Sequence, residues 1–296
     1  MGQTPRVRIH RPPTARFVGR GPSLARSGRS LRTQSPRALH HAMSDSPFVR
    51  IGETVDHVTD VVLCRPPNNF FSAAMIDELA RSWEHLDSDD ATRSIVLRAE
   101  GKHFCAGADF SQTTGRDETA DLYRAAVRLF RTRKPVVAAV QGAAIGGGLG
   151  VALACDFRVA SGEARFSANF SRLGFHHGFG LSVTLPRVVG QQKAAELLYT
   201  GRRLGGEEAK ALGLVDRCVD DNHLIDSAHE LAAEIAASAP LAVESIRTTL
   251  RAGLADQVVA AVDHERAEQE RLRRTNDFAE GVRATAERRA PKFGRN

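Results

Sequence analysis

Residues 134–156 read Lys-Pro-Val-Val-Ala-Ala-Val-Gln-Gly-Ala-Ala-Ile-Gly-Gly-Gly-Leu-Gly-Val-Ala-Leu-Ala-Cys-Asp, and this stretch decides the fold. The apolar, β-branched run Val136–Val140 predicts a short buried strand. Glycines 146–148 predict a tight turn, and the small residues 149–154 predict a helix packed closely against its neighbours. Consecutive glycines cost conformational entropy, so they indicate a place where the backbone must approach another group closely.

A nucleotide phosphate is the first group to test against this glycine turn. The dinucleotide fingerprint Gly-x-Gly-x-x-Gly needs a glycine at its sixth position. That position is Val151 when counted from Gly146 and Leu153 when counted from Gly148, so the fingerprint is absent. No Gly-Lys-Ser/Thr follows, so the P-loop fails as well. Two interpretations stay open: a backbone N–H at a helix N-terminus aimed at a developing negative charge, or a turn that only permits close helix packing.

A second glycine-containing stretch favours the first interpretation. Residues 94–98 predict another short strand, and Phe104–Asp109 then read Phe-Cys-Ala-Gly-Ala-Asp. Together with Gly142–Gly148 (Gly-x-x-x-Gly-Gly-Gly) and the later Cys155-Asp156, this resembles the enoyl-CoA hydratase/isomerase (crotonase) superfamily. Each signature is weak alone, but the pair in this order is specific, and the resemblance runs from about Phe48 to the C-terminus.

Charge separates the first 42 residues from the rest. They hold nine arginines and no Asp, Glu or Lys, which leaves 32 basic against 35 acidic residues, a net charge of −3. Residues 43–296 therefore carry no excess of positive charge that would indicate binding to nucleic acid. Residues 1–42 could be a transit-type peptide, a basic arm for an anionic partner, or an upstream extension before Met43, which we favour; in each case we expect disorder.

Composition fits a cytoplasmic protein with a sizeable core. The chain has 296 residues, of which 42% are hydrophobic, and no run is long enough for a membrane span. The four cysteines are scattered, which is typical of reduced thiols and of neither a zinc site nor a disulfide framework. We expect three parts: the disordered extension 1–42, an acyl-CoA-binding core at 43–235, and a helical region at 236–296.

Strand and helix patterns alternate along the core and predict an α/β architecture with a largely parallel sheet. A hairpin is expected from 48–51 and 57–65, joined near Gly52-Glu53. Further strands are expected at 157–160 and 164–166. Helices are expected at 72–86, 117–133, 191–200, 206–212, 224–238, 241–252 and 257–273. The resemblance implies a crotonase-like spiral of ββα units with a helical C-terminal region that builds a homotrimer, often a hexamer.

The resemblance also implies a site for acyl-CoA thioesters. Two backbone N–H groups, matched to Ala108 and Gly147, would stabilise an enolate-like thioester oxygen. Ala106, Asp109 and Phe110 would contact the adenine end of coenzyme A. Lys292 lies in a C-terminal segment that resembles the family's tail, which can approach the same adenine. No cofactor is expected beyond the CoA of the substrate, and neither nucleic acid nor a membrane is expected as a partner.

The two glutamates that serve a family hydratase as acid and base match Gly150 and Phe170 here, so both carboxylates are absent. Since such groups contribute roughly 10²–10⁴ each, two-glutamate hydration is not expected, nor is isomerisation by the second glutamate. His176 and His177 follow closely and could supply an acid or base near neutrality. They could equally be ordinary loop residues, and adjacent histidines without a third ligand predict no metal site.

Two functions remain: an acyl-CoA enzyme with a non-standard acid or base, and an acyl-CoA binding protein that kept the oxyanion hole and lost catalysis. Imidazoles pointing into the pocket near Gly147 would favour the enzyme. Imidazoles facing solvent, with Phe170 filling the glutamate position, would favour the binding protein. An apolar acyl pocket could be formed by Phe70, Phe71, Phe170, Phe175 and Phe179.

Overall fold

The structure, a computed structural model, describes residues 47–108 and 119–296. The expected extension 1–42 lies outside the described residues, and so do Asp109 and Phe110. Within the described ranges no helix is both long and apolar enough to cross a membrane.

The main sheet has six strands in the order β1-β2-β3-β4-β6-β9. They are β1 (Val49–Val55), β2 (Val58–Leu63), β3 (Ser94–Ala99), β4 (Val136–Val140), β6 (Phe157–Ser161) and β9 (Arg217–Val219). Only β1 runs antiparallel; each of the other neighbouring pairs is parallel. The largely parallel sheet is therefore confirmed, and the apolar run of β4 is buried at every residue, as expected of a strand covered on both faces.

The turn of the first hairpin differs from the prediction. It lies at Asp56-His57, where φ is 48° and 67°, and not at Gly52-Glu53. Gly52 instead sits inside β1, where the pairing register shifts between Ile51 and Thr54. A Cβ on Gly52 would lie 3.0 Å from Asp60 Cβ, so the glycine permits a β-bulge against the neighbouring strand.

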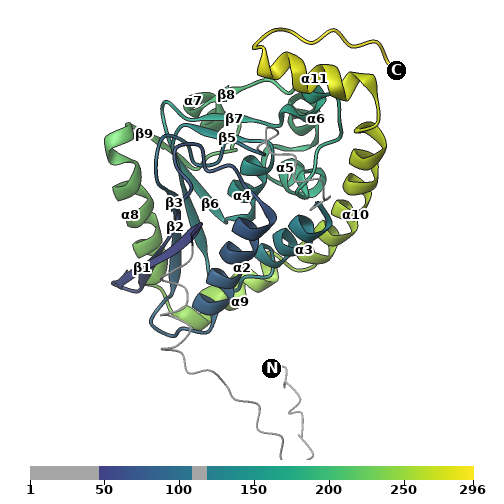
Figure 1. The fold of residues 1–296 in the computed structure, drawn as a ribbon. Coiled ribbons are helices and arrows are strands. Elements are labelled where there is room, and N and C mark those ends of the chain that lie inside the picture. The colour runs from purple at the N-terminus through teal and green to yellow at the C-terminus, as the bar shows by residue number, and fades with distance from the viewer. Residues whose placement is uncertain (1–46, 109–118) are drawn as a thin grey trace, which may run out of the picture.

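Helices cover both faces of this sheet (Figure 1). One face carries α8 (Leu224–Ala236), which contacts β3, β4 and β6. The other carries α2 (Ala73–Asp87), α3 (Thr119–Leu129) and α4 (Gly147–Ala154). The Ser72 side chain caps α2 by accepting the N–H of Met75 at 3.2 Å.

A small second sheet positions the glycine turn. In this sheet β5 (Ala143–Ile145) pairs in parallel with β7 (Arg165–Ser167), and β7 pairs antiparallel with β8 (Leu204–Gly205). The sequence predicts no strand at β5, because these three residues lie between Gly142 and Gly146 and resemble part of the glycine turn. Since α4 begins directly after β5 and Gly146, the second sheet fixes where the N-terminus of α4 points.

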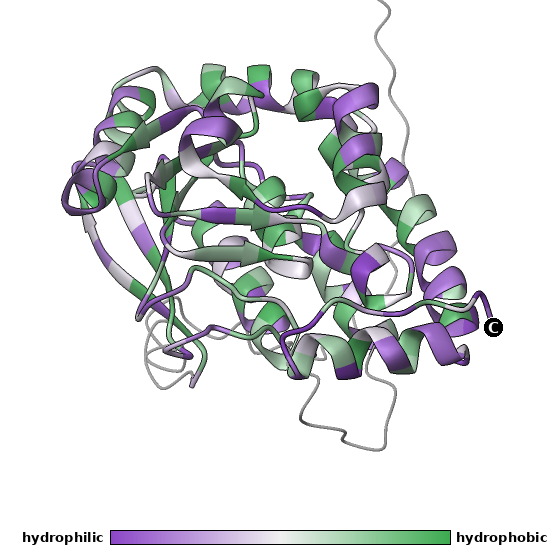
Figure 2. Ribbon diagram, turned by 90° about the horizontal axis from the view of Figure 1, so that it is seen from above, coloured by the Kyte–Doolittle hydropathy of each residue, from purple (hydrophilic) through white to green (hydrophobic). Residues whose placement is uncertain are grey.

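The C-terminal half is helical, as predicted. It contains η1 (Asn169–Leu173), α5 (Leu181–Val189), α6 (Gln191–Thr200), α7 (Gly206–Ala211), η2 (Asp221–His223), α9 (Pro240–Leu250), α10 (Leu254–Leu272) and α11 (Asn276–Ala286). α10 packs on α3 and α5, and α11 packs on η1. The outer helices alternate hydrophobic and hydrophilic residues along their length (Figure 2).

Asp156 ties α9 to the sheet through its carboxylate. Its carboxylate accepts the N–H of Val136 at 2.9 Å, Nε of Arg247 at 2.9 Å and a guanidinium N–H of Arg251 at 2.8 Å. Both guanidinium groups are largely buried, so this one carboxylate is the ion-pair partner of two buried cations.

Candidate active site

The three consecutive glycines are required by close contacts around the start of α4. Gly146 has φ 57°, and its N–H donates to the Ser167 carbonyl at 2.8 Å. A Cβ on Gly148 would lie 2.1 Å from the carbonyl oxygen of Cys105. A Cβ on Gly147 would lie 2.3 Å from Cε1 of Phe71. Every residue of α4 is buried, so the helix N-terminus lies in an apolar interior.

Ala108 and Gly147 lie beside the same aromatic residue. Phe71 forms a parallel bridge with Ala108, and its N–H donates to the Gly107 carbonyl at 3.1 Å, while its ring lies against Gly147. Segment 105–108 also runs along β5, since Cys105 N donates to the Ala143 carbonyl at 2.9 Å. The fold therefore brings together the two residues that the sequence matched to an oxyanion hole.

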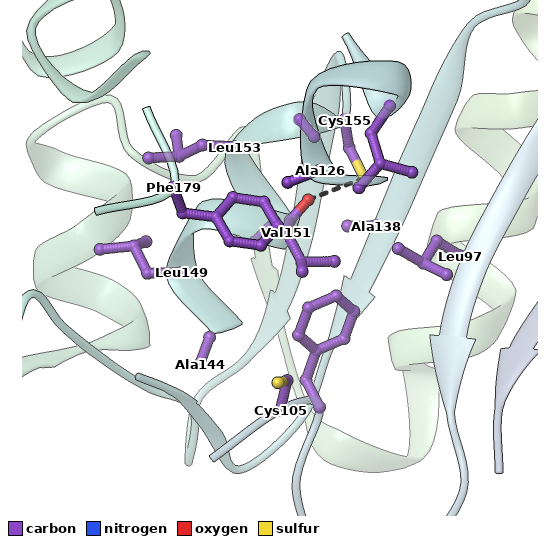
Figure 3. Packing of buried hydrophobic residues seen from close by; sticks show 14 of the residues in the cluster. Leu97, Cys105, Ala126, Ala138, Ala144, Leu149, Val151, Leu153, Cys155 and Phe179 are labelled. Carbon is purple, nitrogen blue, oxygen red and sulfur yellow. Dashed lines mark hydrogen bonds between the residues drawn. The ribbon is translucent and has the colours of Figure 1, made fainter. Parts of the chain in front are cut away.

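The positions matched to the family's glutamates are enclosed by aromatic rings. A Cβ on Gly150 would lie 2.6 Å from Cδ1 and 2.7 Å from Cβ of Phe179, which is 1% exposed and lies beside α4 (Figure 3). Phe170 is buried, and its Cζ would lie 3.6 Å from a Cβ on Gly146. Neither position therefore carries a group that titrates.

Both histidines are partly buried behind Phe170. Their rings stack with centroids 4.1 Å apart, and the His177 ring centroid is 6.5 Å from that of Phe170. His177 Nε2 lies 2.8 Å from Ser182 Oγ. Burial, together with the neighbouring His176 and His264, lowers the pKa of His177 to about 4, although a carboxylate oxygen of Glu265 lies 3.9 Å away. Burial outweighs that attraction, so His177 is neutral near pH 7.

Glu265 on α10 is the polar residue of this region that sequence reasoning missed. It is fully buried and accepts the N–H of Gly180 at 2.8 Å, the N–H of Ser182 at 3.0 Å and the Ser182 hydroxyl at 2.6 Å. These donors belong to the start of α5, where a helix favours negative charge. Nothing local in the sequence marks Glu265, because its partners lie more than 80 residues earlier in the chain.

A neighbouring hydrogen-bond chain holds the histidine loop against two helices. The Tyr123 hydroxyl of α3 donates to Gln269 Oε1 at 2.9 Å, and Gln269 Nε2 donates to the His176 carbonyl at 3.0 Å. Burial, reinforced by the nearby Glu265 carboxylate, raises the pKa of Tyr123, so the phenol stays protonated. The loop is thereby fixed by α3 and α10.

A basic cavity of about 1390 Å³ borders the same strands. Its walls include Ile145, Ser167 and Asn169, next to the glycine turn. The basic side chains that line it are Lys102, His103, Arg165, Arg172, Arg203, Arg288 and Arg289, with no acidic residue among the lining residues. Such a cavity favours an anionic ligand.

The remaining candidates are spread around this region. Ala106 N–H donates to the Asn68 carbonyl at 2.9 Å, at the base of its loop. Lys292 lies outside the basic cavity, beside α11, where its N–H donates to Glu280 at 2.9 Å. Cys105 is fully buried, and burial raises the pKa of its thiol to about 11, so it is no nucleophile. The described residues contain no His, Cys, Asp and Glu grouping that could hold a metal ion.

Comparison with known proteins agrees with this architecture. Residues 53–296 match the family described as enoyl-CoA hydratase/isomerase. The chain is 32% identical over 253 residues to the enoyl-CoA isomerase/hydratase fer4 of Mycosarcoma maydis, covering 80% of this chain and 92% of that protein. It superimposes on the crystal structure of an enoyl-CoA hydratase/isomerase from Pseudoalteromonas atlantica with a TM-score of 0.73 and 31% identity, covering 83% and 99% of the two chains.

A second crystal structure, of an enoyl-CoA hydratase from Bacillus anthracis, is 32% identical with a TM-score of 0.66 and covers 83% of this chain and 98% of that one. These likenesses confirm the crotonase-like α/β fold. The chain belongs to the enoyl-CoA hydratase/isomerase family.

Proposed function

We propose that the chain is an acyl-CoA enzyme that stabilises a thioester enolate between the backbone N–H groups of Ala108 and Gly147. The observation that carries the proposal is the convergence of both residues on Phe71, at the N-terminus of the buried helix α4. Backbone donors in a water-poor site need no reorganisation during reaction, and each is worth about 10²–10³ in rate.

The acid or base in this proposal is an imidazole. Gly150 and Phe170 carry no carboxylate, and the Phe179 ring leaves no room for a side chain at position 150. Neutral His177, bordering Phe170, is a proton acceptor on this side of the glycine turn, with His176 stacked on it. The reaction is therefore expected to be one that needs proton transfer at the α-carbon and not two-glutamate hydration.

The basic cavity supports the choice of an acyl-CoA as substrate. The phosphates of coenzyme A need cationic partners, and Lys102, Arg165, Arg203 and Arg288 supply positive charge without a carboxylate partner among the described residues. Following the family resemblance, we place the adenine end near Ala106, Asp109, Phe110 and Lys292. We further propose a cytoplasmic homotrimer or hexamer with no cofactor other than the CoA of its substrate.

A non-catalytic acyl-CoA binding protein is the second candidate. Phe170 and Phe179 favour it, because they fill the space beside both positions where the family keeps its carboxylates. The oxyanion donors would then only bind a thioester carbonyl.

Exchange of α-protons separates the two candidates without knowledge of the final product. Butyryl-CoA is incubated with the protein in D₂O, uptake of deuterium is followed by mass spectrometry, and binding is measured by calorimetry. The enzyme incorporates deuterium, whereas the binding protein binds without exchange. Crotonyl-CoA and longer enoyl-CoAs are then tested for loss of the conjugated thioester absorbance.

Gly147→Ala is the variant to compare. Its Cβ would meet the far end of the Phe71 ring, which can swing away, so the fold should persist. Alanine keeps the backbone N–H, but its Cβ and the displaced ring should disturb the geometry of the donor, so exchange should fall by up to the factor of about 10²–10³ that one donor is worth. Gly162→Ala is the matched control, because a Cβ there meets nothing within 4 Å. Absence of binding would refute the acyl-CoA assignment, and rapid crotonyl-CoA hydration would refute the argument from the missing carboxylates.

A further inference from the structure

The position of one hydrogen atom follows from the contacts of Ser182. Glu265 is fully buried and its two carboxylate oxygens receive three donors, two from the backbone and one from the Ser182 hydroxyl at 2.6 Å. A carboxylate only accepts hydrogen bonds. The single hydrogen of the Ser182 hydroxyl is therefore committed to Glu265.

Ser182 Oγ must then act as an acceptor toward His177. His177 Nε2 lies 2.8 Å from this oxygen, a hydrogen-bond distance. With the serine hydrogen pointing at Glu265, the hydrogen between the two residues belongs to Nε2. A neutral imidazole carries one hydrogen, so the lone pair of His177 is on Nδ1.

The adjacent histidine has the opposite arrangement. His176 Nδ1 lies 2.8 Å from the His177 carbonyl oxygen, which only accepts. His176 in its neutral form therefore carries its hydrogen on Nδ1. The neighbours of each ring therefore fix the two stacked histidines as different tautomers. In one spectrum, the signals of either histidine can be compared with those of the other.

The groups facing His177 keep it neutral. His176 stacks on it from the same loop, Glu265 approaches it from α10, and His264, also on α10, contacts the ring of His176. Phe170 covers it from η1, and Tyr123 of α3 lies against the following Gly178, with its phenol protonated. Burial, reinforced by the two other imidazoles, disfavours a positive charge on His177 and lowers its pKa to about 4.

We propose that Ser182 and Glu265 are positioning residues that hold His177 as its Nε2–H tautomer and leave Nδ1 as the nitrogen that accepts a proton. The tautomer itself stands on geometry alone. Its use rests on the proposed function: Nδ1 takes the α-proton of the thioester, the C–H electron pair forms the carbon–carbon double bond of the enolate, and the carbonyl π pair moves to the thioester oxygen. When the enolate collapses, that pair re-forms the carbonyl, and the α-carbon takes up either the proton held on Nδ1 or one that Nδ1 has exchanged with solvent.

Nuclear magnetic resonance of protein with ¹⁵N-labelled histidine tests the tautomer directly. Signals are assigned with His176→Gln and His177→Gln. At neutral pH we expect Nε2–H for His177 and, in the same sample, Nδ1–H for neutral His176. Ser182→Ala should shift His177 toward a mixture of tautomers, whereas Ser182→Thr, which keeps the hydroxyl, should retain Nε2–H. Ser171→Ala, which removes a buried hydroxyl without a hydrogen-bond partner among the described residues, is the control and should change nothing.

A dominant Nδ1–H form of His177, or an unchanged spectrum in Ser182→Ala, would overturn the proposal. If Ser182→Ala does not fold, Ser182→Cys gives the same comparison, because a thiol of similar size is only a weak hydrogen-bond acceptor for Nε2–H of His177. These spectra need no turnover, so they stand even where α-proton exchange is absent. Where exchange occurs, Ser182→Ala should lower its rate, by no more than the roughly 10²–10⁴-fold that a general base supplies, and leave acyl-CoA affinity unchanged.

Discussion

Gly150→Ala tests whether the first glutamate position of the family is closed in this chain. The new Cβ would lie 2.6 Å from Cδ1 and 2.7 Å from both Cβ and Cγ of Phe179. Because two of these atoms lie at the root of the side chain, rotating the ring cannot relieve the overlap. Phe179 is 1% exposed and already has φ 62°, so its backbone has little freedom to retreat.

The expected loss of stability follows from two opposing effects. Overpacking a buried site typically costs about 1–3 kcal/mol. Replacing glycine by alanine inside a helix returns up to about 1 kcal/mol through helix propensity. We therefore expect Gly150→Ala to lower the free energy of unfolding by about 1–2 kcal/mol, measured by urea denaturation at one fixed protein concentration.

A double-mutant cycle identifies the cause. Phe179→Ala alone should cost about 3–5 kcal/mol, because it leaves a cavity. In that background, Gly150→Ala should cost clearly less than in the wild type, because Cγ and the ring have gone and only the contact with Cβ of residue 179 at 2.7 Å remains. Strict additivity, or a Gly150→Ala variant as stable as the wild type, would refute the reasoning. Gly162→Ala, in open space, should stay within about 0.5 kcal/mol of the wild type.

Two further predictions concern charges away from the site. Asp156→Asn should lower the free energy of unfolding by about 3–5 kcal/mol, because it leaves Arg247 and Arg251 buried without their carboxylate; a loss under 1 kcal/mol in urea denaturation would contradict this. His229 Nε2 lies 2.9 Å from Asp60 Oδ1, and this hydrogen bond raises the pKa of His229 above its ordinary 6.5. Its stabilisation, about 0.2–1 kcal/mol for a partly exposed pair, is full below pH 6.5 and is lost as the pH rises through the raised pKa. His229→Gln should therefore differ from the wild type more at pH 5.5 than at pH 8.5, and equal differences at both would count against the pairing.

The sequence by itself determined the architecture and the location of the candidate site. The apolar, β-branched runs at 95–97 and 136–140 mark two of the parallel strands, as expected where helices cover both faces of the sheet. Three glycines in a row mark a close backbone approach, and Gly148 against the Cys105 carbonyl accounts for one of them. Each of these patterns lies within a short stretch of sequence, so it can be recognised without the tertiary structure.

The tertiary structure alone decided what surrounds the site. The hairpin turn at Asp56-His57 was missed because Gly52 resembles a turn residue but serves a bulge. The role of Phe179 beside Gly150, and of Glu265 beside Ser182, depends on segments that lie far apart in the sequence and meet only when α4, α5 and α10 pack. A buried carboxylate or a filled cavity leaves no periodic pattern in the chain, because its cause is the packing of other elements against it.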